Sequence, residues 1–223
     1  MKQLSVETIV SRAWDLAVKH WPLFVLIVLI EQFLGNIGLS VDQTVLTSLG
    51  QNPDPVAISQ ALGESVKVSP WIILSVLVSL YLGYVTYRLL RNAITTGKPY
   101  ESLGDELKID INSFAIFFAV DVVYGLAIGL GSLLCILPGI FIAVRWMFAP
   151  YIAATEDVSF GEAFRRSWQL TQGYFWKLFL LGLVAILIGI VGLICCCVGY
   201  LFAAVIINFM LVVAYQDLKE DVC

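Results

Sequence analysis

The sequence predicts an all-α protein, a polytopic transmembrane helical bundle of about six spans. We expect three hairpins of spans, each preceded by an interfacial amphipathic helix. Of the 223 residues, 60% are hydrophobic and only 13% are charged, about half the charged share of a typical soluble domain. The mean hydropathy is +0.90. These values argue against a soluble enzyme or a disordered chain, and 13 basic against 17 acidic residues argue against a nucleic-acid binder.

Six apolar stretches are long enough, or nearly so, to cross a hydrocarbon core of about 30 Å as helices. They are Trp21 to about Leu39, Trp71 to Leu90, Ser113 to Leu137, Gly139 to about Ala154, Phe175 to Leu193, and Val198 to Tyr215. The fourth is short, so it is tilted, broken near Pro150 or only partly inserted. The first lacks a small-residue cleavage site and is expected to be retained. Residues 1–223 are expected to form a single integral membrane domain.

The distribution of lysine and arginine predicts the orientation. With both termini in the cytoplasm, 11 of the 13 basic residues lie inside, Lys67 lies outside and Arg145 lies within a span. Omitting the fourth span would place Arg165, Arg166 and Lys177 outside, against the positive-inside rule. The outer turns are expected at 40–69, at Leu137-Pro138-Gly139 and at 195–199.

A weak repeat precedes the hairpins and defines units of about 5–90, 102–154 and 159–215. The first and third share a pattern, since Arg12-Ala13-Trp14-Asp15-Leu16 resembles Arg166-Ser167-Trp168-Gln169-Leu170. Ser159 and Glu162 predict a capping box. We expect Trp14 and Trp168 at headgroup level, with Arg165 and Arg166 facing anionic lipids or a partner protein. The alternative is that these helices simply pack on the cytoplasmic ends of the spans.

Three ionisable residues are predicted at membrane depth, namely Glu31, Asp121 and Arg145. Such residues are costly unless they are paired, hydrated or able to reach the interface. Counted along straight helices, Glu31 and Arg145 are nearest in depth, with Asp121 as the alternative partner of Arg145. They form either a buried ion pair that fixes helix orientation or a polar pocket for an ion, a proton or a headgroup.

Small residues predict where helices approach closely. The pairs Gly125 with Gly129 and Ala185 with Gly189 fit internal packing better than a dimer. The cysteines expected at the outer end form a disulfide or act as small apolar fillers; these are Cys135, Cys195, Cys196 and Cys197. His20 is the only histidine, so no metal site is expected. Nucleotide-binding and hydrolase motifs are absent, so we expect neither an enzyme nor a cofactor.

The segment from Leu137 to Phe179 carries a further signal. It contains Leu137-Pro138-Gly139, Arg145-Trp146-Met147-Phe148-Ala149-Pro150-Tyr151, Glu156-Asp157-Val158-Ser159 and Glu162-Ala163-Phe164-Arg165-Arg166-Ser167-Trp168. This succession resembles the YciC-like bacterial inner-membrane proteins and the membrane domain of some glycerophosphodiester phosphodiesterases. The resemblance implies a six-span protein of the bacterial cytoplasmic (inner) membrane. Catalytic residues of the phosphodiesterase barrel have no counterparts here, so none of that activity is implied.

Two functional hypotheses follow. The first is an integral membrane protein without a catalytic site that organises lipids or partner proteins through Trp14, Arg165, Arg166 and Trp168. The alternative is a small transporter or lipid-handling protein with a polar pocket around Glu31, Asp121 and Arg145. Membrane lipids are the expected partners, with a protein partner or homo-oligomer as a further option.

Overall fold

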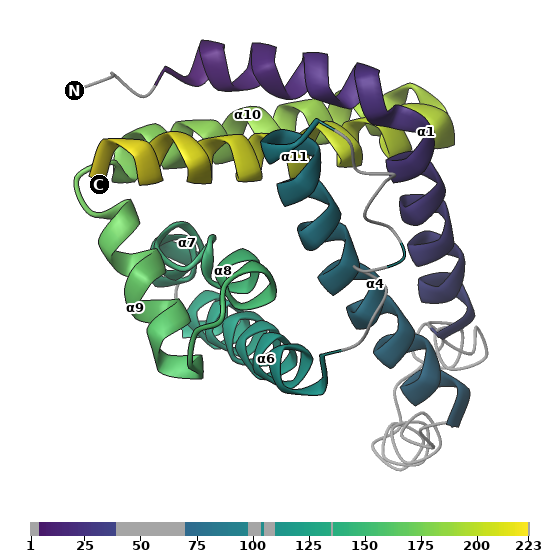
Figure 1. Cartoon of the computed structure of the whole chain (residues 1–223), viewed down its shortest axis with the longest axis horizontal. Helices are drawn as coiled ribbons and strands as arrows, with labels where there is room; N and C mark the ends of the chain where they lie inside the picture. Colours follow the sequence, from purple (N-terminus) through teal and green to yellow (C-terminus); the bar gives the residue numbers. More distant parts are fainter. Residues whose placement is uncertain (1–4, 39–69, 98–103, 105–109, 135, 223) are drawn as a thin grey trace, which may run out of the picture. The chain divides into compact units, whose positions relative to one another are not determined.

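The computed structural model describes every residue except 1–4, 39–69, 98–103, 105–109, 135 and 223 (Figure 1). The described residues confirm the all-α prediction and contain no strand. Their helices are α1 (Val6–Gly38), α4 (Pro70–Thr95), α6 (Ile111–Leu134), α7 (Ile136–Arg145), α8 (Ala149–Thr155), α9 (Phe160–Thr171), α10 (Phe175–Ile194) and α11 (Cys196–Val222).

Five stretches of the described helices are long and apolar enough to cross a membrane, the pattern of a multi-pass membrane protein. They are Val6–Glu31, Ile111–Leu133, Leu137–Thr155, Phe175–Ile194 and Gly199–Glu220. The second expected span lies in α4, which is not among the five, so a count of six stays a prediction. Helix α1 is continuous, so no break in the helix separates the expected N-terminal interfacial segment from the first span. The helix does contain Pro22, a residue type that kinks helices.

Contacts divide the chain into two compact units, Met1–Val28 with Gly83–Cys223, and Leu29–Leu82. That residues 1–223 form a single membrane domain stays a prediction. The smaller unit holds the end of α1 and the start of α4. The outer turn expected at 40–69 lies outside the described residues. So does most of the expected start of the second repeat unit, because 98–103 and 105–109 are not described. All the contacts below lie within the larger unit.

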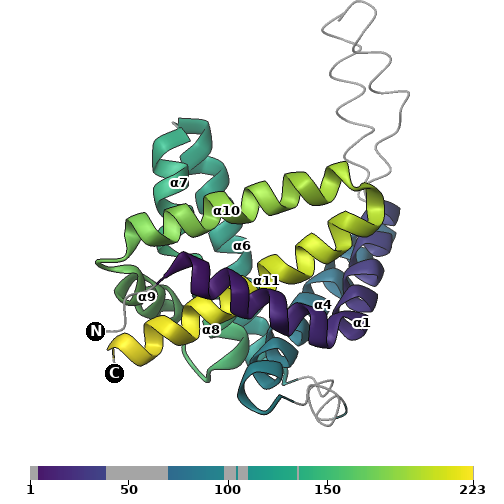
Figure 2. The ribbon, with the colours of Figure 1, turned by 90° about the horizontal axis from the view of Figure 1, so that it is seen from above.

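In the larger unit, α10 and α11 form a hairpin that turns at Cys195 (Figure 2). Glycines make this tight turn possible. A Cβ on Gly192 would lie 2.6 Å from the Ala203 Cβ, and one on Gly199 would lie 2.7 Å from the Gly192 carbonyl oxygen. The predicted five-residue turn is therefore mostly helix, because two residues without side chains let the helices meet.

A second hairpin joins α6 to α7, and its corner differs from the prediction. Pro138 and Gly139 lie in the first turns of α7 instead of forming the turn. Proline is tolerated there because the first backbone N–H groups of a helix have no intrahelical partner. A Cβ on Gly139 would overlap the Ser132 Oγ, so this glycine allows α6 and α7 to approach each other.

The fourth apolar stretch is broken, in agreement with one of its three predicted alternatives. Helix α7 ends at Arg145, and α8 begins at Ala149 with Pro150 in its first turn. Proline lacks the N–H that would continue the hydrogen-bonding ladder of α7. Six of the seven residues of α8 are buried, so the broken segment is enclosed by the surrounding helices.

Candidate functional site

The inner face of α9 fixes this helix on the end of α7. Its buried residues Ala163, Ser167 and Thr171 are spaced four apart and therefore share one face. The Ser167 hydroxyl donates a hydrogen bond to the carbonyl oxygen of Arg145 at 2.9 Å. Thr171 Oγ1 lies 3.3 Å from the same oxygen and shares its one proton with the closer carbonyls of Ser167 and Trp168. The Arg145 carbonyl belongs to the last residue of α7 and has no partner within its own helix. The Ser167 hydroxyl therefore caps α7 from a different helix.

The guanidinium of Arg145 lies among three aromatic rings. Its Cζ is 4.9 Å from the ring centroid of Trp168, 5.4 Å from that of Phe141 and 5.8 Å from that of Phe175. Its Nε and Nη1 are buried and have no hydrogen-bond partner. A cation–π contact is worth about 0.5–2 kcal/mol, but leaving a buried donor unsatisfied costs about 1–3 kcal/mol. The rings therefore hold the charge without satisfying its donors.

The structure does not pair Arg145 with Asp121, the alternative partner, and the pairing with Glu31 stays a prediction. Among the described residues, no ion pair joins Arg145 to Asp121, which is half-buried on α6. Glu31 belongs to the smaller unit, which is not placed relative to Arg145. The depth estimate assumed a straight fourth helix. Because α7 ends at Arg145 and its guanidinium meets Phe175 at the start of α10, the charge lies at the α9 end of that span.

A carboxylate hub lies nearby, in the connection between α8 and α9. Glu156 accepts hydrogen bonds from Arg166 Nη1, Tyr215 OH and Lys219 Nζ, each at 2.6 Å. Partial burial opposes ionisation of Glu156, but the hydrogen bonds from Lys219, Tyr215 and Arg166 outweigh this effect and lower its pKa. The ring of Tyr215 also packs on Tyr151, with centroids 4.8 Å apart. This hub ties α9 and α11 to the α8–α9 connection.

The hub changes the expected role of Arg166. Its Nε and Nη2 also bind Glu162 Oε1, at 3.0 and 2.6 Å, so two carboxylates occupy the guanidinium that was expected to face lipids. The predicted capping box does not form. Ser159 is the N-cap residue of α9 but makes no side-chain capping bond, and the Glu162 carboxylate binds Arg166. Arg165 is exposed and has no such partner in the described part of the chain.

Basic residues from four helices gather at this end of the unit. In addition to Arg166 and Lys219, Arg12 binds Asp217 at 2.6 Å, and Arg91 Nη1 donates a hydrogen bond to the Thr155 carbonyl oxygen. On α1, Ala13 and Ala17 are fully buried, whereas the neighbouring Trp14 is 53% exposed. The N-terminal part of α1 therefore packs by its small residues and presents its tryptophan outward.

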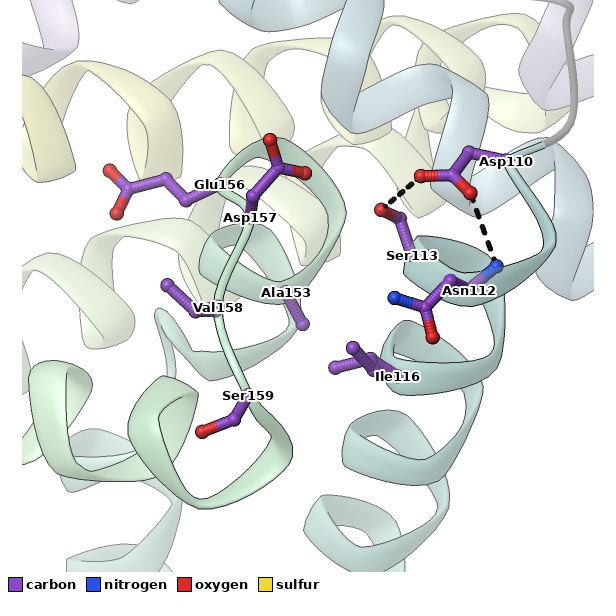
Figure 3. Close-up of a pocket in the computed structure, with 9 residues that line it drawn as sticks. All are labelled: Asp110, Asn112, Ser113, Ile116, Ala153, Glu156, Asp157, Val158 and Ser159. Atoms are coloured by element: carbon purple, nitrogen blue, oxygen red, sulfur yellow. Dashed lines mark hydrogen bonds between the residues drawn. The ribbon is translucent and has the colours of Figure 1, made fainter.

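A pocket of about 390 Å³ separates the start of α6 from the α8–α9 connection (Figure 3). Asp110 caps α6 by accepting hydrogen bonds from Ser113 Oγ at 2.6 Å and from the Asn112 N–H at 3.2 Å. The bond from Ser113 is the main cause that lowers the pKa of Asp110. The Glu156 carboxylate points away from Asp110. The acids beside the pocket thus serve a helix cap and the hub.

The glycine pairs are placed differently from each other. A Cβ on Gly125 or Gly129 would meet no atom within 4 Å, so the internal contact expected there is not made within the described part of the chain. Gly189 faces α11, where a Cβ would lie 3.8 Å from Ile207 Cδ1, and Ala185 is half-buried. The tightest contacts, at Gly139, Gly192 and Gly199, lie near the hairpin corners. In the sequence, these contacts were indicated only by a glycine close to each expected turn.

Of the four cysteines expected at the outer end, the structure describes the side chain of one. Cys195 is an exposed free thiol. Cys135 and the side chains of Cys196 and Cys197 lie outside the described residues, so a disulfide among these cysteines stays a prediction. Within the described ranges, no group of three or more His, Cys, Asp or Glu side chains is placed to hold a metal ion.

Comparison with known proteins gives a family but no activity. No curated protein and no solved structure matches the chain. Residues 77–218, which are more than half of the chain and include α6 to α10, match one family of proteins. The chain belongs to the family described as "Domain of unknown function (DUF7847)".

Proposed function

We propose that this chain is a non-enzymatic protein of the bacterial cytoplasmic membrane that organises anionic lipids at its cytoplasmic face. One surface carries the proposal. It consists of Arg165 and Trp168 on α9 and Trp176 and Lys177 at the start of α10, and we call it the aromatic–basic surface. All four residues are exposed, with Trp168 at 38% and Trp176 at 77%. The opposite face of α9 is held by buried hydroxyls, so the surface is rigidly presented.

Lipid headgroups suit this surface because of where α10 begins. Phe175 is the first residue of a helix apolar enough to span a membrane, so the neighbouring residues lie where the hydrocarbon core ends. Tryptophan is enriched at that level, and a basic side chain near an anionic leaflet contributes about 1 kcal/mol of attraction. The ring of Trp176 contacts Phe175, with centroids 5.7 Å apart, which joins the surface to the span.

The grouping of basic residues supports the proposed orientation. Arg12, Arg91, Arg166 and Lys219 come from four different helices and meet at one end of the unit, beside the aromatic–basic surface. Positive charge concentrates on the cytoplasmic side of membrane proteins. We therefore assign this end to the cytoplasm.

The test compares lipid retention by variants of the full chain. The wild type, purified with mixed phosphatidylglycerol and phosphatidylethanolamine of matched acyl chains, should retain the anionic lipid preferentially in native mass spectrometry. Replacing Arg165 and Lys177 together with glutamine removes about 2 kcal/mol of attraction, so the preference should fall by a factor of roughly 30. Lys19→Gln, an exposed cation on α1, is the matched control and should leave the preference unchanged.

Three results would refute the proposal. The wild type could show no preference for the anionic lipid, or the double variant could keep the wild-type preference. A purified chain that carries a stoichiometric protein at this surface in place of lipid would indicate a docking site for a protein instead.

A further inference from the structure

In the part of the chain that the structure describes, Arg145 lacks the carboxylate partner that Arg12 and Arg166 have. Arg12 and Arg166 each have a carboxylate oxygen at 2.6 Å. Arg145 is also drawn into the packed structure, yet its Nε and Nη1 are buried without any acceptor. Its neighbours Phe141, Trp168 and Phe175 offer only ring faces. The cation is thus held in place while its hydrogen-bonding capacity is unused.

The unused donors define the chemistry of a fitting ligand. A guanidinium presents five N–H donors in a planar fork that matches a phosphate or a carboxylate through two parallel hydrogen bonds. The nearby hydroxyls of Ser167 and Thr171 are engaged with backbone carbonyl oxygens and do not compete for an anion. A ligand with two acceptor oxygens and a negative charge would complete the site.

The surroundings favour a phosphate at the membrane boundary. Arg145 is half-buried, and the Trp168 ring over its guanidinium is 38% exposed, so the guanidinium lies close to the surface of the unit. Phe175, at the start of α10, contacts the same guanidinium. This is the level at which the phosphates of lipid headgroups lie if α10 spans the membrane.

We infer that the Arg145 guanidinium is a binding site for a phosphate group, supplied by the headgroup of an anionic glycerophospholipid. The inference rests on the proposed function in one respect, the placement of the aromatic–basic surface at the membrane boundary. Within that surface it adds a specific site. Arg165 and Lys177 attract headgroups through charge, whereas Arg145 binds one phosphate through its planar donors, and Trp168 covers the bound group.

The experiment measures binding of short-chain phosphatidylglycerol to the full chain in detergent, by native mass spectrometry and by the thermal shift on titration. Inorganic phosphate is titrated in parallel. Arg145→Gln should weaken phosphatidylglycerol binding at least tenfold. Arg145→Lys keeps the charge but loses the fork, and should also weaken binding about tenfold while the fold is kept. Lys19→Gln, an exposed cation on α1 outside both the ring cluster and the aromatic–basic surface, is the control and should leave the binding unchanged.

Each outcome has a defined meaning. Wild-type affinity in Arg145→Lys overturns the inference, because a single-point cation would then suffice. Equal binding by wild type and Arg145→Gln also overturns it, and the proposed function survives if the Arg165 and Lys177 double variant still loses the lipid. If inorganic phosphate gives the Arg145-dependent shift and the lipid does not, the phosphate site stands and the lipid source is refuted. If wild type prefers no anion, both proposals fail.

Discussion

Removal of the Glu156 carboxylate should destabilise the protein, because three elements converge on this side chain. Glu156→Ala deletes the acceptor of Tyr215, Lys219 and Arg166 at once. The three donors differ in how much water can replace the lost acceptor. Tyr215 is only 5% exposed, whereas the side chains of Arg166 and Lys219 are 42% and 53% exposed.

These exposures determine the expected magnitude. A buried hydroxyl left without a partner costs about 1–3 kcal/mol. Each exposed ion pair contributes about 0–1 kcal/mol. The loss should total about 1–5 kcal/mol, centred on about 3 kcal/mol, which corresponds to a decrease in Tm of about 6–12 °C at the centre of that range for a chain of this size.

The assay is differential scanning fluorimetry of the full chain in a mild detergent. Asp157→Ala is the matched control, since this neighbouring carboxylate is exposed and has no partner in the described structure, and its Tm should change by less than about 2 °C. Tyr215→Phe tests the mechanism, because its loss should not add to that of Glu156→Ala. A Glu156→Ala variant as stable as the control, or fully additive losses, would refute the hub as a stabilising element.

Three further predictions use the same measurement. The folded pKa of Glu156 lies below its ordinary value, so the stability that its carboxylate contributes is present above about pH 4.3 and is lost as the pH falls through the folded pKa. Glu156→Gln should therefore reduce the fall of Tm at acid pH, and an unchanged fall would contradict the assignment. Ser167→Ala removes a buried hydrogen bond to the Arg145 carbonyl and should lower the free energy of unfolding by about 1 kcal/mol. An unchanged Tm would mean that this hydrogen bond does not stabilise the fold. Gly192→Ala places a Cβ 2.8 Å from a backbone oxygen and should lower Tm, but Gly125→Ala meets open space and gains helix propensity of up to about 1 kcal/mol; the opposite order would show that Gly125, not Gly192, lies at a tight contact.

The helical class and most of the apolar stretches could be predicted from the sequence because they depend on composition and length alone. The α10 boundaries follow from a long run of Leu, Ile and Val, which favours a helix in a membrane. Helix α11 extends beyond the predicted Val198–Tyr215 at both ends, from Cys196 to Val222. The break at Arg145 was one of three alternatives, since Pro150 signals a disrupted ladder without fixing which residue ends the preceding helix.

The partners of individual charges could not be predicted in the same way. Arg165 and Arg166 are adjacent and chemically identical, yet one is exposed and the other binds two carboxylates. That difference depends on the rotation of α9, which is set by the buried Ser167 and Thr171. Likewise, helix counting gave Arg145 an acidic partner, whereas the aromatic environment arises from Trp168, a residue 23 positions later in the sequence.

The capping of α7 by a hydroxyl of α9 has a consequence for biogenesis. Helix α7 cannot satisfy its own last carbonyl, and the hydroxyl that does so lies 22 residues further along the chain. Until α9 has been synthesised and has docked, water is the only partner left for that carbonyl. The last turn of the α6–α7 hairpin is thus completed by a segment outside the hairpin.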